Sequence, residues 1–105
     1  MVSKKLHTLL NEQIGNELGA ELQYLAMACW ADRENFPGIA GWFRSQASEE
    51  HEHAMKILGW MQEWDLDVSI TGTSAPTTSF DGLESVFDDA LGHEQQVTAQ
   101  INEIY

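Results

Sequence analysis

The stretch of residues 47–56 reads Ala-Ser-Glu-Glu-His-Glu-His-Ala-Met-Lys. It lies in a longer segment whose apolar residues recur every three or four positions: Ile39, Phe43, Ala47, Ala54, Ile57, Met61 and Trp64. Such spacing places the side chains on one stripe of an amphipathic helix. The stripe 39, 43, 46, 50, 53, 57 passes through Glu50 and His53, which share a helix face because they are three residues apart. The sequence therefore predicts a helix that turns a carboxylate and an imidazole toward a neighbouring element.

Two further helical segments flank this one. The chain from Ser3 to Arg33 contains no proline, and its apolar residues recur at helical spacing: Leu6, Leu10, Ala20, Tyr24 and Met27. A third stripe consists of Leu83, Phe87, Ala90, Val97, Ile101 and Ile104. The intervening Asn35-Phe36-Pro37-Gly38 is typical of a tight turn. We expect helices over about residues 3–33, 38–65 and 81–105, of which the first two form an antiparallel hairpin.

The segment between the second and third helices, residues 66–80, is rich in Ser, Thr, Gly and Pro and has no helical period. Fully extended, it spans up to roughly 50 Å, so we expect a crossover that returns along the bundle and a third helix parallel to the second. Asp81 and Glu84 are expected to cap that helix. Three long amphipathic helices leave one side of a bundle open. Residues 1–105 are therefore expected to form one all-α domain that resembles a four-helix bundle without its last long helix.

Each apolar stripe is interrupted at its middle by an ionisable residue. Glu17 interrupts the first stripe, Glu50 and His53 the second, and Glu94 the third. Burial of an ionised carboxylate costs several kcal/mol unless the group is paired or metal-bound. The chain has only five basic residues, none of which lies on a stripe near its middle: Lys4, Lys5, Arg33, Arg44 and Lys56. A cation from outside the chain is the natural partner.

Glu17, Glu50 and His53 lie at similar distances from the turn that joins their helices. Glu17 lies 16 residues before Arg33, and Glu50 and His53 lie 12 and 15 residues beyond Gly38, so an antiparallel hairpin brings them to one level. Glutamates from separate helices with a Glu-x-x-His motif form the di-iron carboxylate arrangement of helical bundles. Hard oxygen donors with one imidazole suit Fe or Mn and, less specifically, Zn. The alternative for any single glutamate is a residue at the edge of the core whose carboxylate reaches water.

The charge of the chain excludes some functions. The 105 residues include seventeen Asp and Glu against five Lys and Arg, a formal net charge of −12. Such a surface repels phosphate backbones, so we expect no nucleic-acid partner, and it attracts cations. The single cysteine, Cys29, forms no internal disulfide. There is no apolar run long enough for a signal peptide or a membrane span, so we expect no membrane association and a cytoplasmic location.

Longer motifs identify a family. The chain resembles bacterial non-haem ferritins in Leu10-Asn11-Glu12-Gln13-Ile14 through Glu17, Tyr24-Leu25-Ala26-Met27, Trp42-Phe43-Arg44, Ala47-x-Glu49-Glu50-x-x-His53-Ala54-Met55-Lys56 and His93-Glu94-Gln95-x-Val97. The similarity covers the whole chain in order. It implies a ferritin-like four-helix bundle whose subunit oxidises Fe(II) with O2 and stores Fe(III) inside a cage of identical subunits, with a dimer as the minimum assembly.

The resemblance also assigns residues. By matching position, Glu17, Glu50 and His53 correspond to the first iron site, and Glu50 bridges to the second. Glu94 corresponds to a ligand of the second site, Glu49 to a ligand of a third site, and Tyr24 to the tyrosine beside the centre. Family members continue into a fourth long helix, which carries the remaining ligands, and a short fifth one. The sequence ends where the third helix would finish.

Several alternatives remain open at this point. The chain is either a ferroxidase subunit or a truncated or half-size protein that binds metal but is catalytic only if another chain supplies the missing ligands. A non-catalytic helical remnant and a di-iron oxygenase or peroxidase are further alternatives. Among nearby residues, His51 is expected to be solvated, and Glu21 is expected either to add a carboxylate or to lie at an interface.

Overall fold

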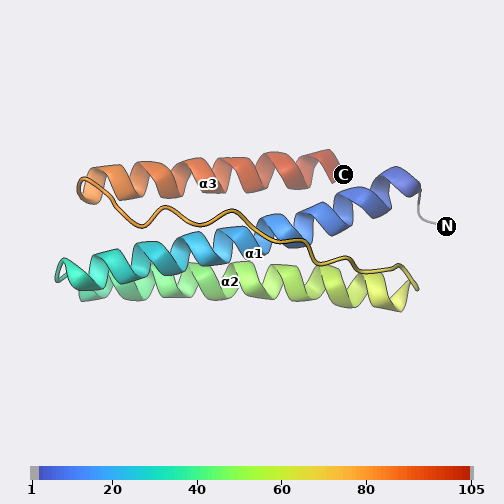
Figure 1. The fold of residues 1–105 in the computed structure, drawn as a ribbon, viewed down its shortest axis with the longest axis horizontal. Coiled ribbons are helices and arrows are strands. Elements are labelled where there is room, and N and C mark those ends of the chain that lie inside the picture. Colours follow the sequence, from blue (N-terminus) through green and yellow to red (C-terminus); the bar gives the residue numbers. More distant parts are fainter. Residues whose placement is uncertain (1–2, 105) are drawn as a thin grey trace.

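The computed structural model describes residues 3–104, which form three helices and no strand. Helix α1 spans Lys4–Arg33, α2 spans Pro37–Glu63 and α3 spans Leu83–Ile104. Figure 1 shows an elongated bundle in which α1 runs antiparallel to both α2 and α3, so that α3 is parallel to α2 as expected. The described residues extend over 50 × 20 × 20 Å. Tyr105, the expected end of the third helix, lies outside the described residues.

The first two helices end in the same way. Asn35 and Asp65 adopt left-handed backbone conformations, with φ of 64° and 56°, two residues after the last residue of α1 and of α2. The next residue donates its N–H back across the turn: Phe36 to the Ala31 carbonyl at 2.8 Å and Leu66 to the Met61 carbonyl at 2.9 Å. These are Schellman caps in which Asn or Asp replaces the usual glycine. Helix α2 therefore ends at Glu63, two residues before the expected boundary.

The start of α3 corrects a second expectation. The helix begins at Leu83, and the Val86 N–H donates to the Gly82 carbonyl at 3.1 Å, so Gly82 holds the N-cap position. The expected capping pair of Asp81 and Glu84 is therefore wrong by one residue. Glycine is itself an acceptable N-cap residue, with a preference close to that of threonine.

The crossover lies along α1 and is held there by side chains of α1. The Gln23 amide accepts from the Thr77 N–H and donates to the Thr77 carbonyl, both at 2.9 Å. Asn11 accepts from the Ser69 N–H at 2.8 Å and donates to the Asp67 carbonyl at 3.2 Å. These bonds satisfy backbone groups of a segment that, as described, has neither helix nor strand. Figure 1 shows the segment returning along the length of the bundle.

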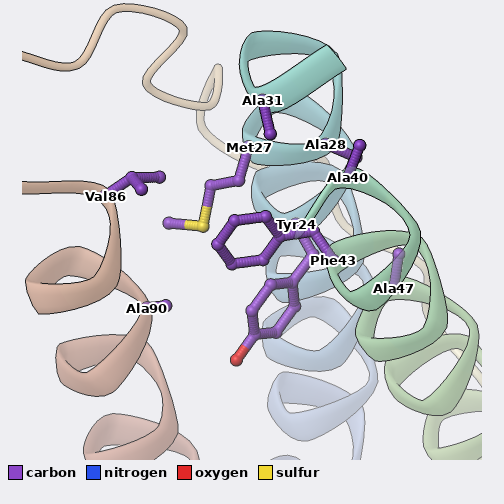
Figure 2. Packing of buried hydrophobic residues seen from close by; sticks show 9 residues of the cluster. All are labelled: Tyr24, Met27, Ala28, Ala31, Ala40, Phe43, Ala47, Val86 and Ala90. Carbon is purple, nitrogen blue, oxygen red and sulfur yellow. The ribbon is translucent and has the colours of Figure 1, made fainter. Parts of the chain in front are cut away.

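The core is divided into two apolar clusters. One lies near the α1–α2 turn and contains the residues shown in Figure 2: Tyr24, Met27, Ala28, Ala31, Ala40, Phe43, Ala47, Val86 and Ala90. The other lies toward the opposite end and is built on Leu10, Ile14 and Met61. Between them on the same helices are buried polar residues, including Glu17 and Glu50. The division creates a polar layer in the middle of the bundle.

One side of α2 and α3 is uncovered within residues 3–104. Trp42, Phe87 and Leu91 expose 47%, 41% and 58% of their surface, although Phe87 was expected on the buried stripe. The fully buried residue of that turn is its neighbour Val86. A separate groove with a volume of about 350 Å³ is lined in part by Leu10, Ile101 and Ile104. This agrees with the open side that the sequence predicts. No helix among residues 3–104 has the length and apolar character needed to cross a bilayer.

The close approach of the crossover to α1 gives a test of this packing. A Cβ atom at Gly15 would lie 3.0 Å from the Thr71 hydroxyl, whereas a Cβ at Gly92 of α3 would meet no atom within 4 Å. We expect Gly15→Leu to lower the free energy of unfolding by about 1–3 kcal/mol, because the side chain displaces the crossover. Gly92→Leu should leave stability unchanged or raise it, since leucine favours the helix. Urea denaturation of both variants measures the difference, and equal effects would contradict the packing.

Candidate metal centre

Three side chains from α1 and α2 converge in the polar layer. One ligand atom from each of Glu17, Glu50 and His53 lies within 4.8 Å of the other two. The Nδ1 atom of His53 is 3.5 Å from the Oε2 atoms of both glutamates. Two atoms bound to one ion lie at most about 4.4 Å apart when metal–ligand bonds are near 2.2 Å. Small rotations of these side chains are therefore enough to bring all three onto one cation.

The two carboxylates are buried and incompletely satisfied. Glu17 and Glu50 expose 0% and 3% of their surface, and the Oε2 atom of each has no hydrogen-bond partner. Within residues 3–104, no lysine or arginine pairs with either glutamate. Buried polar atoms in folded proteins are nearly always satisfied, so these two oxygens call for a positively charged partner. The donor set of two carboxylates and an imidazole fits a divalent metal.

His53, the third residue of the cluster, is accessible to solvent. The His53 side chain exposes 46% of its surface and lines the apolar groove together with Glu17. The groove therefore borders the cluster on the side of His53 and Glu17.

Helix α3 contributes Glu94, which is bound to Tyr24. The Tyr24 hydroxyl donates to the Glu94 carboxylate, and the tyrosine is 1% exposed. In Figure 2 the tyrosine oxygen points out of the apolar cluster, away from Ala31. Burial, the hydrogen bond to Glu94 and the charges of nearby glutamates raise the pKa of Tyr24 far above its usual value. The phenol is therefore a stable proton donor that holds the Glu94 carboxylate, which lies outside the three-residue cluster.

Burial and the neighbouring carboxylates change the protonation of Glu50. Burial first, then the adjacent carboxylates of Glu17, Glu94 and Glu49, raise the pKa of Glu50 to about 9. Without a cation, the site therefore keeps a proton on Glu50 at neutral pH. A metal ion would displace that proton, because a coordinating carboxylate must be ionised.

Glu49 and Glu21 lie near the cluster but are not part of it. Glu49 is exposed and does not belong to it, although its charge contributes to the raised pKa of Glu50. Glu21 pairs on the surface with His51, whose Nδ1 atom lies 3.0 Å from its carboxylate and whose side chain is 50% exposed. His51 is therefore half solvated and bound to a partner on α1.

One residue of this layer was missed from the sequence. Gln13 is 2% exposed, and its Nε2 donates to the Oε1 atom of Glu17 at 3.1 Å. It lies one helical turn before Glu17 on the same stripe, 6, 10, 13, 17, 20, 24. Its presence on an apolar stripe was a usable signal, because a polar residue at such a position usually bonds to another buried polar group.

Comparisons with known proteins show the family to which the chain belongs. Residues 7–105 match the family model described as a ferritin-like domain, and the chain belongs to that family. A bacterial non-heme ferritin from Campylobacter jejuni is 36% identical over 102 residues, which cover 97% of this chain and 61% of that relative. A bacterial non-heme ferritin from Staphylococcus aureus is 37% identical over 98 residues, which cover 93% and 59%.

Solved ferritin structures have the same fold. An Archaeoglobus fulgidus ferritin engineered into a closed form superimposes with a TM-score of 0.94 at 32% identity, covering 99% of this chain and 63% of that one. A PmFTN variant soaked in iron overnight superimposes with a TM-score of 0.93 at 25% identity, covering 97% and 65%. These ferritins have a four-helix bundle fold, as the sequence predicts for this chain. The chain spans about 60% of the length of the curated relatives it matches.

The raised pKa of Glu50 predicts an unusual dependence of stability on pH. The carboxyl ionises near pH 4.5 when unfolded and near pH 9 when folded. Between these values the folded state keeps a proton that the unfolded state has lost, so the free energy of unfolding falls as the pH rises. Glu50→Gln removes this titration. In metal-free buffer, we compare the free energy of unfolding of the variant with that of the parent. Between pH 5 and pH 8 this difference should change in favour of the variant by more than about 1.4 kcal/mol, the free energy of one pKa unit.

Chemical denaturation at the two pH values measures this gain. Glu52→Gln is the matched control, because Glu52 lies on the same helix but is exposed. The difference between Glu52→Gln and the parent should not change with pH. A constant difference for Glu50→Gln as well would contradict the raised pKa of Glu50.

Proposed function

We propose that the chain is an iron-storage subunit that binds Fe(II) at Glu17, Glu50 and His53 and oxidises it to Fe(III) with O2. The observation that supports this most strongly is the pair of buried carboxylate oxygens without partners beside His53. Membership of the ferritin-like domain family and the names of the bacterial relatives favour iron over other divalent ions. Mn or Zn would occupy the same donor set without undergoing this oxidation.

In this proposal iron is the substrate, and the protein residues bind and position it. Glu17 and His53 hold the first Fe(II), while Glu50 bridges toward a second ion near Glu94. Oxidation of two Fe(II) ions supplies two electrons to one O2 molecule, and carboxylates stabilise the Fe(III) product through their charge. Tyr24 keeps the Glu94 carboxylate in place by donating a hydrogen bond to it. Glu49 is the candidate for an additional ion site at the exposed edge.

The charge of the whole chain favours delivery of the substrate. A formal net charge of −12 raises the local concentration of cations near the surface. We propose that the subunit assembles with identical copies, with a dimer as the minimum and a cage as the storage form. We also propose that the subunit is located in the cytoplasm, where Fe(II) is available.

A second function has a specific observation in its favour. Only three ligand atoms of residues 3–104 gather within 4.8 Å, and Glu94 lies outside this group. A chain with that set alone would bind one metal ion tightly and would oxidise iron slowly, unless another segment or another chain supplied further ligands. This alternative is a metal-binding ferritin-like protein without its own catalytic activity.

Oxidation of Fe(II) by the oxygen-free protein after admission of air tests the proposal. Glu50→Ala should slow the rapid formation of Fe(III) at least about 100-fold, because it removes the residue shared by the two iron positions. Glu52→Ala, the exposed neighbour on α2, should oxidise iron like the parent. The rate of ferric absorbance and the iron bound per chain are the two measurements.

The outcomes separate the two functions. Rapid oxidation of two iron ions per chain supports the ferroxidase. One tightly bound ion that is oxidised slowly supports the metal-binding alternative. If Glu50→Ala binds and oxidises iron as fast as the parent, the site assignment is wrong.

A further inference from the structure

Gln13 is a buried residue of α1 that donates a side-chain hydrogen bond to Glu17, a proposed metal ligand. The Nε2 atom of Gln13 donates to the Oε1 atom of Glu17 at 3.1 Å, and the Asn16 amide donates to the Oε1 atom of Gln13 at 3.4 Å. The bond occupies one oxygen of the Glu17 carboxylate. The other oxygen, Oε2, has no hydrogen bond and lies 3.5 Å from the Nδ1 atom of His53. The two oxygens of Glu17 therefore have different surroundings.

We propose that Gln13 is a positioning residue that fixes the Glu17 carboxylate, so that only its Oε2 atom is presented to the metal. The inference rests on the proposed function, in which Glu17 is a metal ligand. It adds that the mode of binding, through one oxygen, is set by a residue that does not touch the ion. Asn16 supports this orientation, because its amide donates to the Gln13 Oε1 atom and so favours the amide orientation whose NH2 group faces Glu17.

The physical argument depends on the burial of this pair. Gln13 and Glu17 are 2% and 0% exposed, so water does not replace the hydrogen bond if it is lost. A carboxylate without the bond rotates freely about its last torsion and offers both oxygens to the ion. Fixing it before the metal arrives removes that rotational entropy from the cost of binding. Hydrogen bonds to metal ligands typically contribute 10–100-fold in metal affinity.

The chain contains a matched control on the same helix. Gln23 is also buried, at 6% exposure, and its amide makes two hydrogen bonds of 2.9 Å to Thr77 in the crossover. No atom of the metal cluster is among its partners in the described residues. Loss of the Gln23 amide therefore affects the packing of the crossover, whereas loss of the Gln13 amide affects Glu17.

The experiment compares Gln13→Met with Gln23→Met, because methionine has nearly the length and shape of glutamine but cannot donate a hydrogen bond. Co²⁺ is the probe, since its binding and its visible absorption bands are measured without O2 or turnover. We expect Gln13→Met to bind Co²⁺ about 10–100-fold more weakly than the parent and to shift the absorption bands, because the carboxylate changes its binding mode. Gln23→Met should bind within about twofold of the parent and keep its bands, although it lowers stability through the lost hydrogen bonds.

A second variant guards against a failure of Gln13→Met to fold. Gln13→Asn keeps the amide but is one methylene shorter, so it does not reach Glu17, and it should reproduce the weaker binding and the shifted bands. Parent-like affinity and bands in a folded Gln13 variant would overturn the positioning role while leaving the metal site intact. Equal weakening in the Gln13 and Gln23 variants would also overturn it, since the effect would then follow stability alone. A folded parent that binds no Co²⁺ would overturn the proposed site itself.

Discussion

The burial of two carboxylates in the middle of a helical bundle is the constraint on which the other features depend. Glu17 and Glu50 lie in a layer that separates two apolar clusters, so neither carboxylate reaches solvent along the bundle axis. Without a cation, the repulsion between them is reduced by a proton on Glu50, whose pKa is raised to about 9. The metal-free layer is therefore a local source of instability, and a bound cation would remove it. Such sites commonly lower stability in exchange for function.

Much of the fold and part of the site were accessible from local sequence patterns. Helical periodicity does not depend on long-range contacts, so it located all three helices and placed Glu17, Glu50 and His53 at one level. Their meeting follows from the short α1–α2 turn, which fixes the register of the hairpin. The assignment of metal to these residues remains a prediction.

The features that the sequence did not reveal depend on tertiary contacts. The crossover is held by Asn11 and Gln23, whose partners are backbone groups more than 50 positions away. The buried face of α3 is centred on Val86, which packs with residues of both α1 and α2, and the periodic pattern alone allowed Phe87 instead. A left-handed residue at Asp65 ends α2, although aspartate is a less usual choice there than glycine. Periodicity identifies a helix more reliably than its exact face or its ends.

Helix α3 shows how polar contacts can compensate for sparse packing near a site. The buried residues of α3 are Val86, Ala90 and Val97. Besides its packing on α1, the helix meets α2 through Phe87, whose ring lies against those of Trp42 and Phe43. Glu94 therefore takes its position from the hydrogen bond that Tyr24 donates. The Tyr24 ring is in turn fixed by stacking against Phe43, with 6.1 Å between the ring centroids. The same helix, α1, thus supplies Glu17, the amide that orients Glu17, and the phenol that holds Glu94. The hydrogen bonds that hold Glu17 and Glu94 therefore both originate on α1, so the polar layer depends on the position of this helix more than on any other.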